Sequence, residues 1–132
     1  MPYEALTLSI SIRRPAQDVY EAIWRPLDFP KWASGLSAAR LRLENGEWHA
    51  DGPEGAVRLR FTGHNPFGIM DHWVDLGTGP AIYVPMRVIA NGEGAEVSLM
   101  LFRHPGTTEE QFSADADWMR GDLLALRQML TG

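Results

Sequence analysis

His72, Tyr83 and Arg87 are the residues of this sequence whose types best suit chemistry on a small molecule. His72 lies in IMDHWVDL, where it shares the apolar side of a predicted strand with Met70, Val74 and Leu76. We therefore expect the imidazole to face the interior, where it could donate a hydrogen bond, orient a carbonyl or act as a general base. Tyr83 and Arg87 would add a hydroxyl and a cation for a ligand oxygen if they face inward as well.

Each of these residues also has a purely structural interpretation. His72 could be a core histidine that is held by a neighbouring backbone group. Pro85 leaves the facing of Tyr83 and Arg87 open, because proline removes a ladder donor and often marks a bulge or an edge. No metal site is predicted, since no second histidine or carboxylate lies two residues from His72 on the same face.

Known catalytic and cofactor motifs are absent from the sequence. It contains no G-x-S-x-G elbow, Walker motif, HExxH or EF-hand loop, and the G-x-G at 77–79 precedes a proline and a strand rather than a helix. Asp115 and Asp122 flank the apolar stripe of the last helix, but they lie about 10 Å apart along it and are expected in solvent. The sequence predicts no cofactor and leaves open whether the protein is an enzyme.

Length, charge and composition exclude several classes of protein. The chain has 132 residues, 45% of them hydrophobic, which fits a single domain over 1–132. Its net charge of −5 disfavours nucleic acid as a partner. The lack of cysteine excludes disulfides and thiol catalysis. Without a membrane-length apolar run or a secretory signal, we expect a cytoplasmic protein with no membrane partner.

The spacing of apolar residues predicts one strand, two short helices, six further antiparallel strands and a long helix. Residues 4–12 alternate as a half-buried strand, and Pro15 introduces a helix over 16–24. A second short helical or turn segment covers 27–36. The remaining strands are predicted within 39–51, where Asn45-Gly46 forms a hairpin turn, and within 56–63, 69–76, 81–90 and 95–103.

The last segment changes to helical spacing. Thr108 and Gln111 form a capping-box pattern that introduces a helix over Glu109–Leu130. Its apolar stripe consists of Phe112, Ala116, Met119, Leu123, Leu126 and Leu130. A long apolar stripe is buried only by lying against a sheet, so the chain is predicted to be α+β, with a curved seven-stranded antiparallel sheet wrapped around the C-terminal helix.

Three stretches, together with the terminal helix, resemble a known superfamily. They are ISIRRPAQDVYEAIWRPLDFPKWASGL, NPFGIMDHWVDL and YVPMRVIANGEGAEVSLMLFRHPG. They resemble the START and pollen-allergen-like superfamily, SRPBCC, and in particular its bacterial polyketide cyclase or dehydratase-like branch. The resemblance covers nearly the whole chain. It implies the helix-grip fold with a hydrophobic cavity between the sheet and the long helix, whereas function varies among members.

The leading hypothesis is the binding of a small hydrophobic molecule in that cavity. An alternative is a polyketide cyclase or dehydratase-like enzyme with His72 as acid or base and Tyr83 or Arg87 polarising a carbonyl. A second alternative is a protein-interaction or chaperone-cofactor module, and an outward Trp73 would also suit a homodimer interface. Each predicted inner aromatic could instead fill the core. The candidate ligand-binding residues are Phe29, Trp32, Trp48, Phe61, Met70, His72, Tyr83, Met86, Arg87, Trp118 and Met119.

Overall fold

Strands dominate the first three-quarters of the chain, and a long helix ends it. The computed structural model describes residues 1–34, 40–52 and 55–131. The elements of these residues are β1 (Glu4–Ile12), α1 (Ala16–Ile23), the 3-10 helix η1 (Pro26–Lys31), β2 (Arg42–Glu44), β3 (Glu47–Gly52), β4 (Gly55–Phe61), β5 (His72–Asp75), β6 (Ile82–Val84), β7 (Met86–Asn91), β8 (Gly94–Arg103) and α3 (Glu109–Thr131). Part of the second predicted helical segment, from Gly35, lies outside the described residues.

The sheet contains eight described strands rather than the predicted seven, in two hydrogen-bonded groups. One group has the order β1-β8-β7 and the other β2-β3-β4-β5-β6. The extra strand arises at Pro85, which divides the predicted strand 81–90 into β6 and β7 because proline has no N–H for the ladder. The groups stay adjacent, since the Met100 N–H donates to the Pro85 carbonyl (3.0 Å) and Tyr83 stacks on Phe102. The result is a curved antiparallel sheet.

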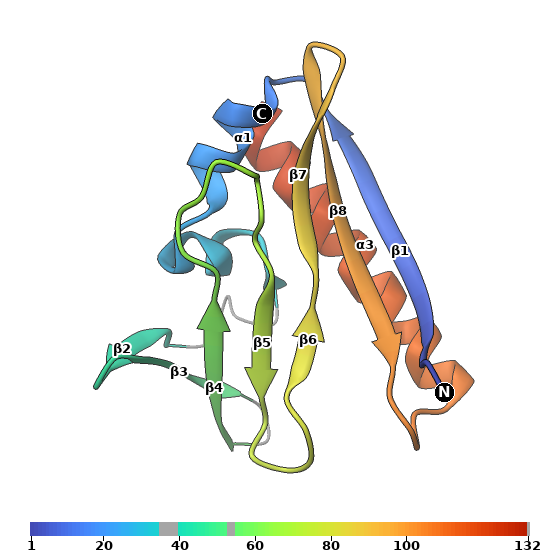
Figure 1. Cartoon of the computed structure of the whole chain (residues 1–132). Helices are drawn as coiled ribbons and strands as arrows, with labels where there is room; N and C mark the ends of the chain where they lie inside the picture. Colours follow the sequence, from blue (N-terminus) through green and yellow to red (C-terminus); the bar gives the residue numbers. More distant parts are fainter. Residues whose placement is uncertain (35–39, 53–54, 132) are drawn as a thin grey trace.

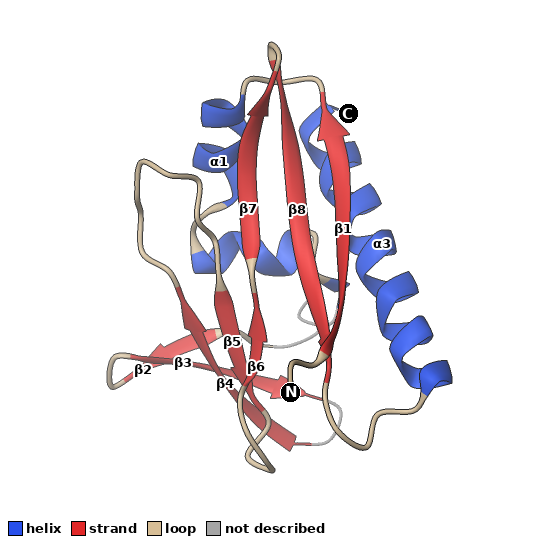
Figure 2. Ribbon diagram, turned by 45° about the vertical axis from the view of Figure 1, so that its right-hand side comes forward, coloured by secondary structure: helices blue, strands red, loops and turns tan. Residues whose placement is uncertain are grey.

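The long helix α3 packs against the part of the sheet formed by β1 and β8. In Figure 1, α3 crosses behind β7, β8 and β1. Figure 2 shows α3 running beside β1, with β2 and β3 projecting on the opposite side of the molecule. Packing of α3 against β1 and β8 agrees with this arrangement. We call the sheet face toward the main core the inner face and the opposite one the outer face.

Helix α3 forms as its stripe and cap predict. Its N-terminus is capped by Thr108, whose Oγ1 accepts a hydrogen bond from the Gln111 N–H at 3.1 Å. The buried residues of α3 are Phe112, Ala116, Leu123 and Leu126, which all belong to the predicted stripe. No helix in the ranges 1–34, 40–52 and 55–131 is long and apolar enough to cross a membrane.

Two short segments contain residues whose positive φ angles account for the amino acids found there. Asn45 and Gly46 connect β2 to β3 with φ of 52° and 79°, the positive angles that an Asn-Gly hairpin turn requires. Gly68, at φ +69°, precedes β5 where the chain passes β7 closely. A Cβ at this position would lie 2.3 Å from the Val88 carbonyl oxygen, so only glycine fits.

Candidate functional site

The strand register decides which side chains share the inner face. Phe61 lies opposite His72, and His72 lies opposite Val84. Trp73 follows His72 along β5, and Tyr83, opposite it, precedes Val84 along β6. Because side chains alternate along a strand, Trp73 and Tyr83 lie on the outer face. His72 therefore faces the interior as its strand pattern predicts.

On the inner face, His72 is surrounded by aromatic rings. Its ring meets Phe29 of η1 edge-on at 5.2 Å between centroids and lies 6.2 Å from Phe61 of β4. Phe29 in turn contacts Phe61 at 4.7 Å and Trp32 at 5.3 Å, and Trp48 of β3 meets Phe61 at 6.1 Å. Phe29, Trp32, Trp48 and Phe61 together form what we call the aromatic shell.

The imidazole of His72 is neutral and has a defined free acceptor. Its Nδ1 lies 3.0 Å from the Met70 carbonyl oxygen. A carbonyl only accepts hydrogen bonds, so Nδ1 carries the proton and Nε2 is the acceptor. Burial lowers the pKa of His72, and the bond to Met70 only partly opposes this effect. Nε2 has no hydrogen-bonding partner among the described residues.

A second polar atom without a partner lies in the aromatic shell. Trp32 is 3% exposed, and its Nε1–H has no hydrogen-bonding partner in the described part of the chain. A buried donor without a partner carries a free-energy cost of about 1–3 kcal/mol. The inner face thus contains one acceptor, on His72, and one donor, on Trp32, for which the described residues provide no partner.

Tyr83 and Arg87 do not join this site, which corrects the expectation that they supply a hydroxyl and a cation to the interior. Both bind Asp71 at the outer face: Tyr83 Oη donates to Asp71 Oδ2 at 2.7 Å, and the Arg87 guanidinium pairs with Oδ1. Their side chains lie on the face opposite that of His72 because of the strand alternation. The enzyme hypothesis that needs all three residues at one point therefore loses its electrophile.

Asp71 is the functional candidate that sequence reasoning missed. It is 7% exposed, and its Oδ1 also accepts a hydrogen bond from the Met86 N–H at 3.0 Å. The alternation of IMDHWVDL places it outward, where a carboxylate is normally solvated. Only the pairing of this strand with β6 and β7 brings it opposite Pro85, where it is buried by tertiary contacts.

The remaining predicted residues divide between core and surface. Met70 and Met86 are buried in the main core, and Met119 is partly buried and packs against it. Trp118 is 60% exposed on α3, so it does not line the interior in this structure. No group of three or more metal-ligating side chains is found among the described residues.

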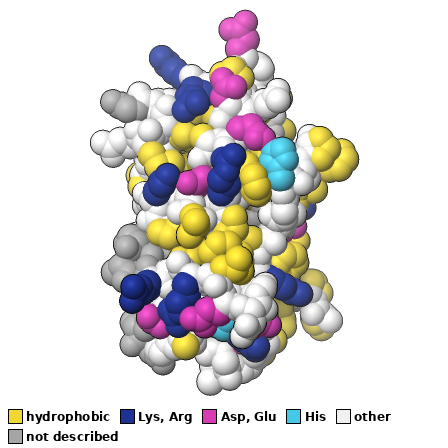
Figure 3. All heavy atoms as spheres, turned by 90° about the vertical axis from the view of Figure 1, so that its left-hand side faces the viewer, with side chains coloured by type: hydrophobic (Ala, Val, Ile, Leu, Met, Phe, Trp, Pro, Cys, Tyr) yellow, Lys and Arg dark blue, Asp and Glu magenta, His cyan; other side chains and the backbone are white. Residues whose placement is uncertain are grey.

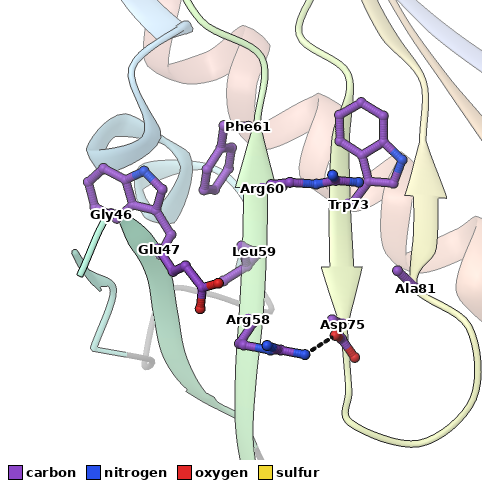
Figure 4. Close-up of a pocket in the computed structure, with 10 residues that line it drawn as sticks. Gly46, Glu47, Arg58, Leu59, Arg60, Phe61, Trp73, Asp75 and Ala81 are labelled. Carbon is purple, nitrogen blue, oxygen red and sulfur yellow. Dashed lines mark hydrogen bonds and ion pairs between the residues drawn. The ribbon is translucent and has the colours of Figure 1, made fainter. Parts of the chain in front are cut away.

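A hollow of about 460 Å³ lies over β4 and β5 (Figure 4). Arg58 pairs there with Asp75 at 2.7 Å, and the Arg60 guanidinium covers the Trp73 ring at 4.7 Å. Figure 3 views the side of the molecule on which β2 and β3 lie in Figure 1. Charged side chains of both signs gather there below a central hydrophobic patch. The lining of this hollow is mixed, because Trp48 and Phe61 of the aromatic shell contribute to it beside these charged side chains.

A smaller hollow of about 280 Å³ has a mostly apolar lining, with His104 and Asp115 as its charged or titratable members. It lies between the β5–β6 turn and the first turns of α3 and is lined in part by Ile82, Leu101 and Phe112. Ile82 lies opposite Val74, which is two residues from His72 on the same face. The Val74–Ile82 pair at this hollow is therefore the next pair on the inner face after His72–Val84.

Comparison with known proteins gives the fold and no family. Neither a protein-family model nor a curated protein sequence matches the chain. An uncharacterized protein from Bacillus thuringiensis is similar with a TM-score of 0.75 and 16% identity, over 98% of this chain and 100% of that one. DynU16, from the dynemicin biosynthetic locus, is similar with a TM-score of 0.71 and 17% identity, over 98% of this chain and 48% of that one. Ara h 8.0201 is similar with a TM-score of 0.64 and 11% identity, over 98% of this chain and 99% of that one.

The protein has the helix-grip fold. Similarity to these structures over nearly the whole chain agrees with the observed curved antiparallel sheet and long C-terminal helix. Because a fold supports many functions, the argument for a function depends on the residues of the inner face.

Proposed function

We propose that the protein binds a small hydrophobic molecule on the inner face of the sheet, with one polar group of the ligand at His72. The observation that carries the proposal is the free Nε2 of His72 within the aromatic shell. Ligand pockets typically combine apolar and aromatic walls with a few convergent polar atoms. Here the walls are the aromatic shell, and the polar atoms are His72 Nε2 and Trp32 Nε1.

The apolar hollow beside α3 supports an entry route for such a ligand. Its lining by Ile82, Leu101 and Phe112 suits a hydrocarbon or aromatic group. A molecule entering there would pass Val74 and reach His72 with its leading polar group. The net charge of −5 also favours a neutral small molecule over nucleic acid.

The similarity in fold supports membership of the SRPBCC superfamily and its polyketide cyclase-like branch. The resemblance of the sequence implies a cavity between sheet and helix. Phe29 and Trp32 of the aromatic shell belong to the same core cluster as Leu123 and Leu126 of α3, which supports a site in that region. Turnover of the bound molecule is not part of the proposal, because Tyr83 and Arg87 lie on the other face of the sheet.

The test is binding of 2-naphthol, an apolar probe with one hydroxyl, measured by isothermal titration calorimetry. We expect saturable binding to the wild-type chain and a loss of about 3- to 10-fold in affinity in His72→Phe, the range of one hydrogen bond. The matched control is His49→Phe, which makes the same change on the outer face beside Arg58 and should leave affinity unchanged. Equal effects of both substitutions, or no binding to the wild type, would contradict the proposed site.

Native mass spectrometry of protein purified from its own host gives a second, independent measurement. A bound species of small mass that is released on denaturation supports the proposal. The extracted compound should then bind again to the wild-type chain and more weakly to His72→Phe. Rebinding of equal strength to both chains would argue against the role of His72.

A further inference from the structure

We propose that Asp71 is a positioning residue that fixes the tautomer of His72 and so makes the inner site prefer ligands that donate a hydrogen bond. This inference rests on the proposed function, because it concerns the polar group of the same ligand. It depends on two hydrogen bonds beside Pro85 in which a side chain takes the place of a backbone partner. The Met86 N–H donates to Asp71, and the Met70 carbonyl accepts from His72.

The exchange begins with an incomplete backbone pair. Ile69 bridges Arg87, and His72 lies opposite Val84, so the same register places Met70 opposite Met86. The Met70 N–H donates to the Met86 carbonyl at 2.9 Å. In an antiparallel pair of this kind the Met86 N–H would return a bond to the Met70 carbonyl. It donates instead to Asp71 Oδ1, at 3.0 Å.

The Met70 carbonyl oxygen, which can accept two hydrogen bonds, therefore has no competing bond from the Met86 N–H. This oxygen accepts the hydrogen bond from His72 Nδ1 at 3.0 Å. The neutral imidazole has a single N–H, so this bond leaves Nε2 unprotonated. Asp71 thus acts on His72 through the backbone of Met86 and Met70, although the two side chains lie on opposite faces of the sheet.

The outer face holds Asp71 in the position that this exchange needs. Tyr83 Oη donates to one carboxylate oxygen at 2.7 Å, and the Arg87 guanidinium pairs with the other. Pro85, directly across the strand pair, has no N–H that could compete for the carboxylate. Four residues on the outer side of the sheet therefore define one proton position on its inner side.

An unprotonated Nε2 determines the class of ligand. An alcohol, a phenol or an N–H group can donate to it, whereas a ketone or an ether would place two acceptors against each other. A buried polar site rejects a ligand that leaves its groups without partners. The preferred ligand is therefore a hydrophobic molecule with a hydroxyl or an N–H at its buried end.

The first experiment reads the tautomer directly, by nitrogen-15 NMR of the His72 ring in the ligand-free protein at neutral pH. We expect the proton on Nδ1 in the wild type and in Asp71→Asn, whose amide oxygen still accepts the Met86 N–H. In Asp71→Ala that N–H can return to the Met70 carbonyl, and we expect the Nε2–H form to appear. A wild-type proton on Nε2, or an unchanged tautomer in Asp71→Ala, would overturn the inference.

The second experiment compares 2-naphthol, a donor, with 2-methoxynaphthalene, which only accepts. The wild type and Asp71→Asn should prefer 2-naphthol by about 3- to 10-fold, and Asp71→Ala should lose that preference. An equal preference in all three chains would overturn the selectivity. If neither probe binds to the wild type, the proposed function is refuted, while the NMR result still decides the role of Asp71. If Asp71→Ala does not fold, Asp71→Leu takes its place in both experiments, because its side chain has nearly the size of the carboxylate and cannot accept the Met86 N–H.

Discussion

Replacing Phe29 with alanine should remove the centre of the aromatic shell. The side chain is 2% exposed and its ring contacts those of Trp32, Phe61 and His72. Substitution of a buried phenylalanine by alanine costs roughly 3–5 kcal/mol of unfolding free energy. Aromatic pairs add about 0.5–1.5 kcal/mol each beyond buried area, so we expect the upper half of that range.

Urea unfolding followed by circular dichroism measures this loss. A domain of this size is stable by about 5–15 kcal/mol, so Phe29→Ala should remain folded in the absence of urea. The control is Phe67→Ala, which makes the same change at a side chain that is 74% exposed and should stay within about 0.5 kcal/mol of the wild type. Similar losses in both variants would refute the packing described for η1.

Benzene provides a further measurement on the same variant. The alanine should leave an apolar space beside His72 that is large enough for the deleted ring, and dry apolar cavities bind benzene. At a benzene concentration 100 times its Kd, binding stabilises the folded state by about 2.7 kcal/mol. We expect this gain in Phe29→Ala and not in Phe67→Ala. No gain in a folded Phe29→Ala would mean that the shell closes and offers no ligand space at His72.

The backbone, the imidazole and the helix cap give three more predictions. Gly68→Ala should destabilise the protein by more than about 1 kcal/mol, because its Cβ would meet the Val88 carbonyl oxygen at 2.3 Å, whereas Gly121→Ala, in open space on α3, should stabilise it by up to about 1 kcal/mol in thermal unfolding. Burial lowers the pKa of His72 in the folded protein, so on acidification the imidazole is protonated in the unfolded chain at a higher pH than in the folded one. Stability should fall as pH drops below about 6.5, by at most about 1.4 kcal/mol per pH unit, and this dependence should be weaker in His72→Phe. Thr108→Ala should cost about 1 kcal/mol in urea unfolding, while Thr108→Ser should cost less, and equal losses would contradict a cap through the hydroxyl.

Several features were predictable from the sequence because their causes are local. The apolar stripe of α3 and its Thr108 cap depend on residues three or four positions apart, and the hairpin turn at Asn45-Gly46 depends on the two turn residues themselves. The inward facing of His72 follows from alternation within one strand. The structure confirms these predictions. They could be made from the sequence because none of them depends on a partner strand.

The tertiary structure decided what depends on pairing between distant segments. The sequence alone determined that Pro85 interrupts a strand, but the two halves pair with β5 and β8 only in the folded sheet. That pairing turns Tyr83 and Arg87 outward to Asp71 and buries a carboxylate that alternation places in solvent. It also withdraws the Met86 N–H from the Met70 carbonyl, and so defines the proton of His72. Residue types and spacing determine the face that a side chain takes along its own strand, whereas its partner is determined by the strand register, which joins residues far apart in the chain.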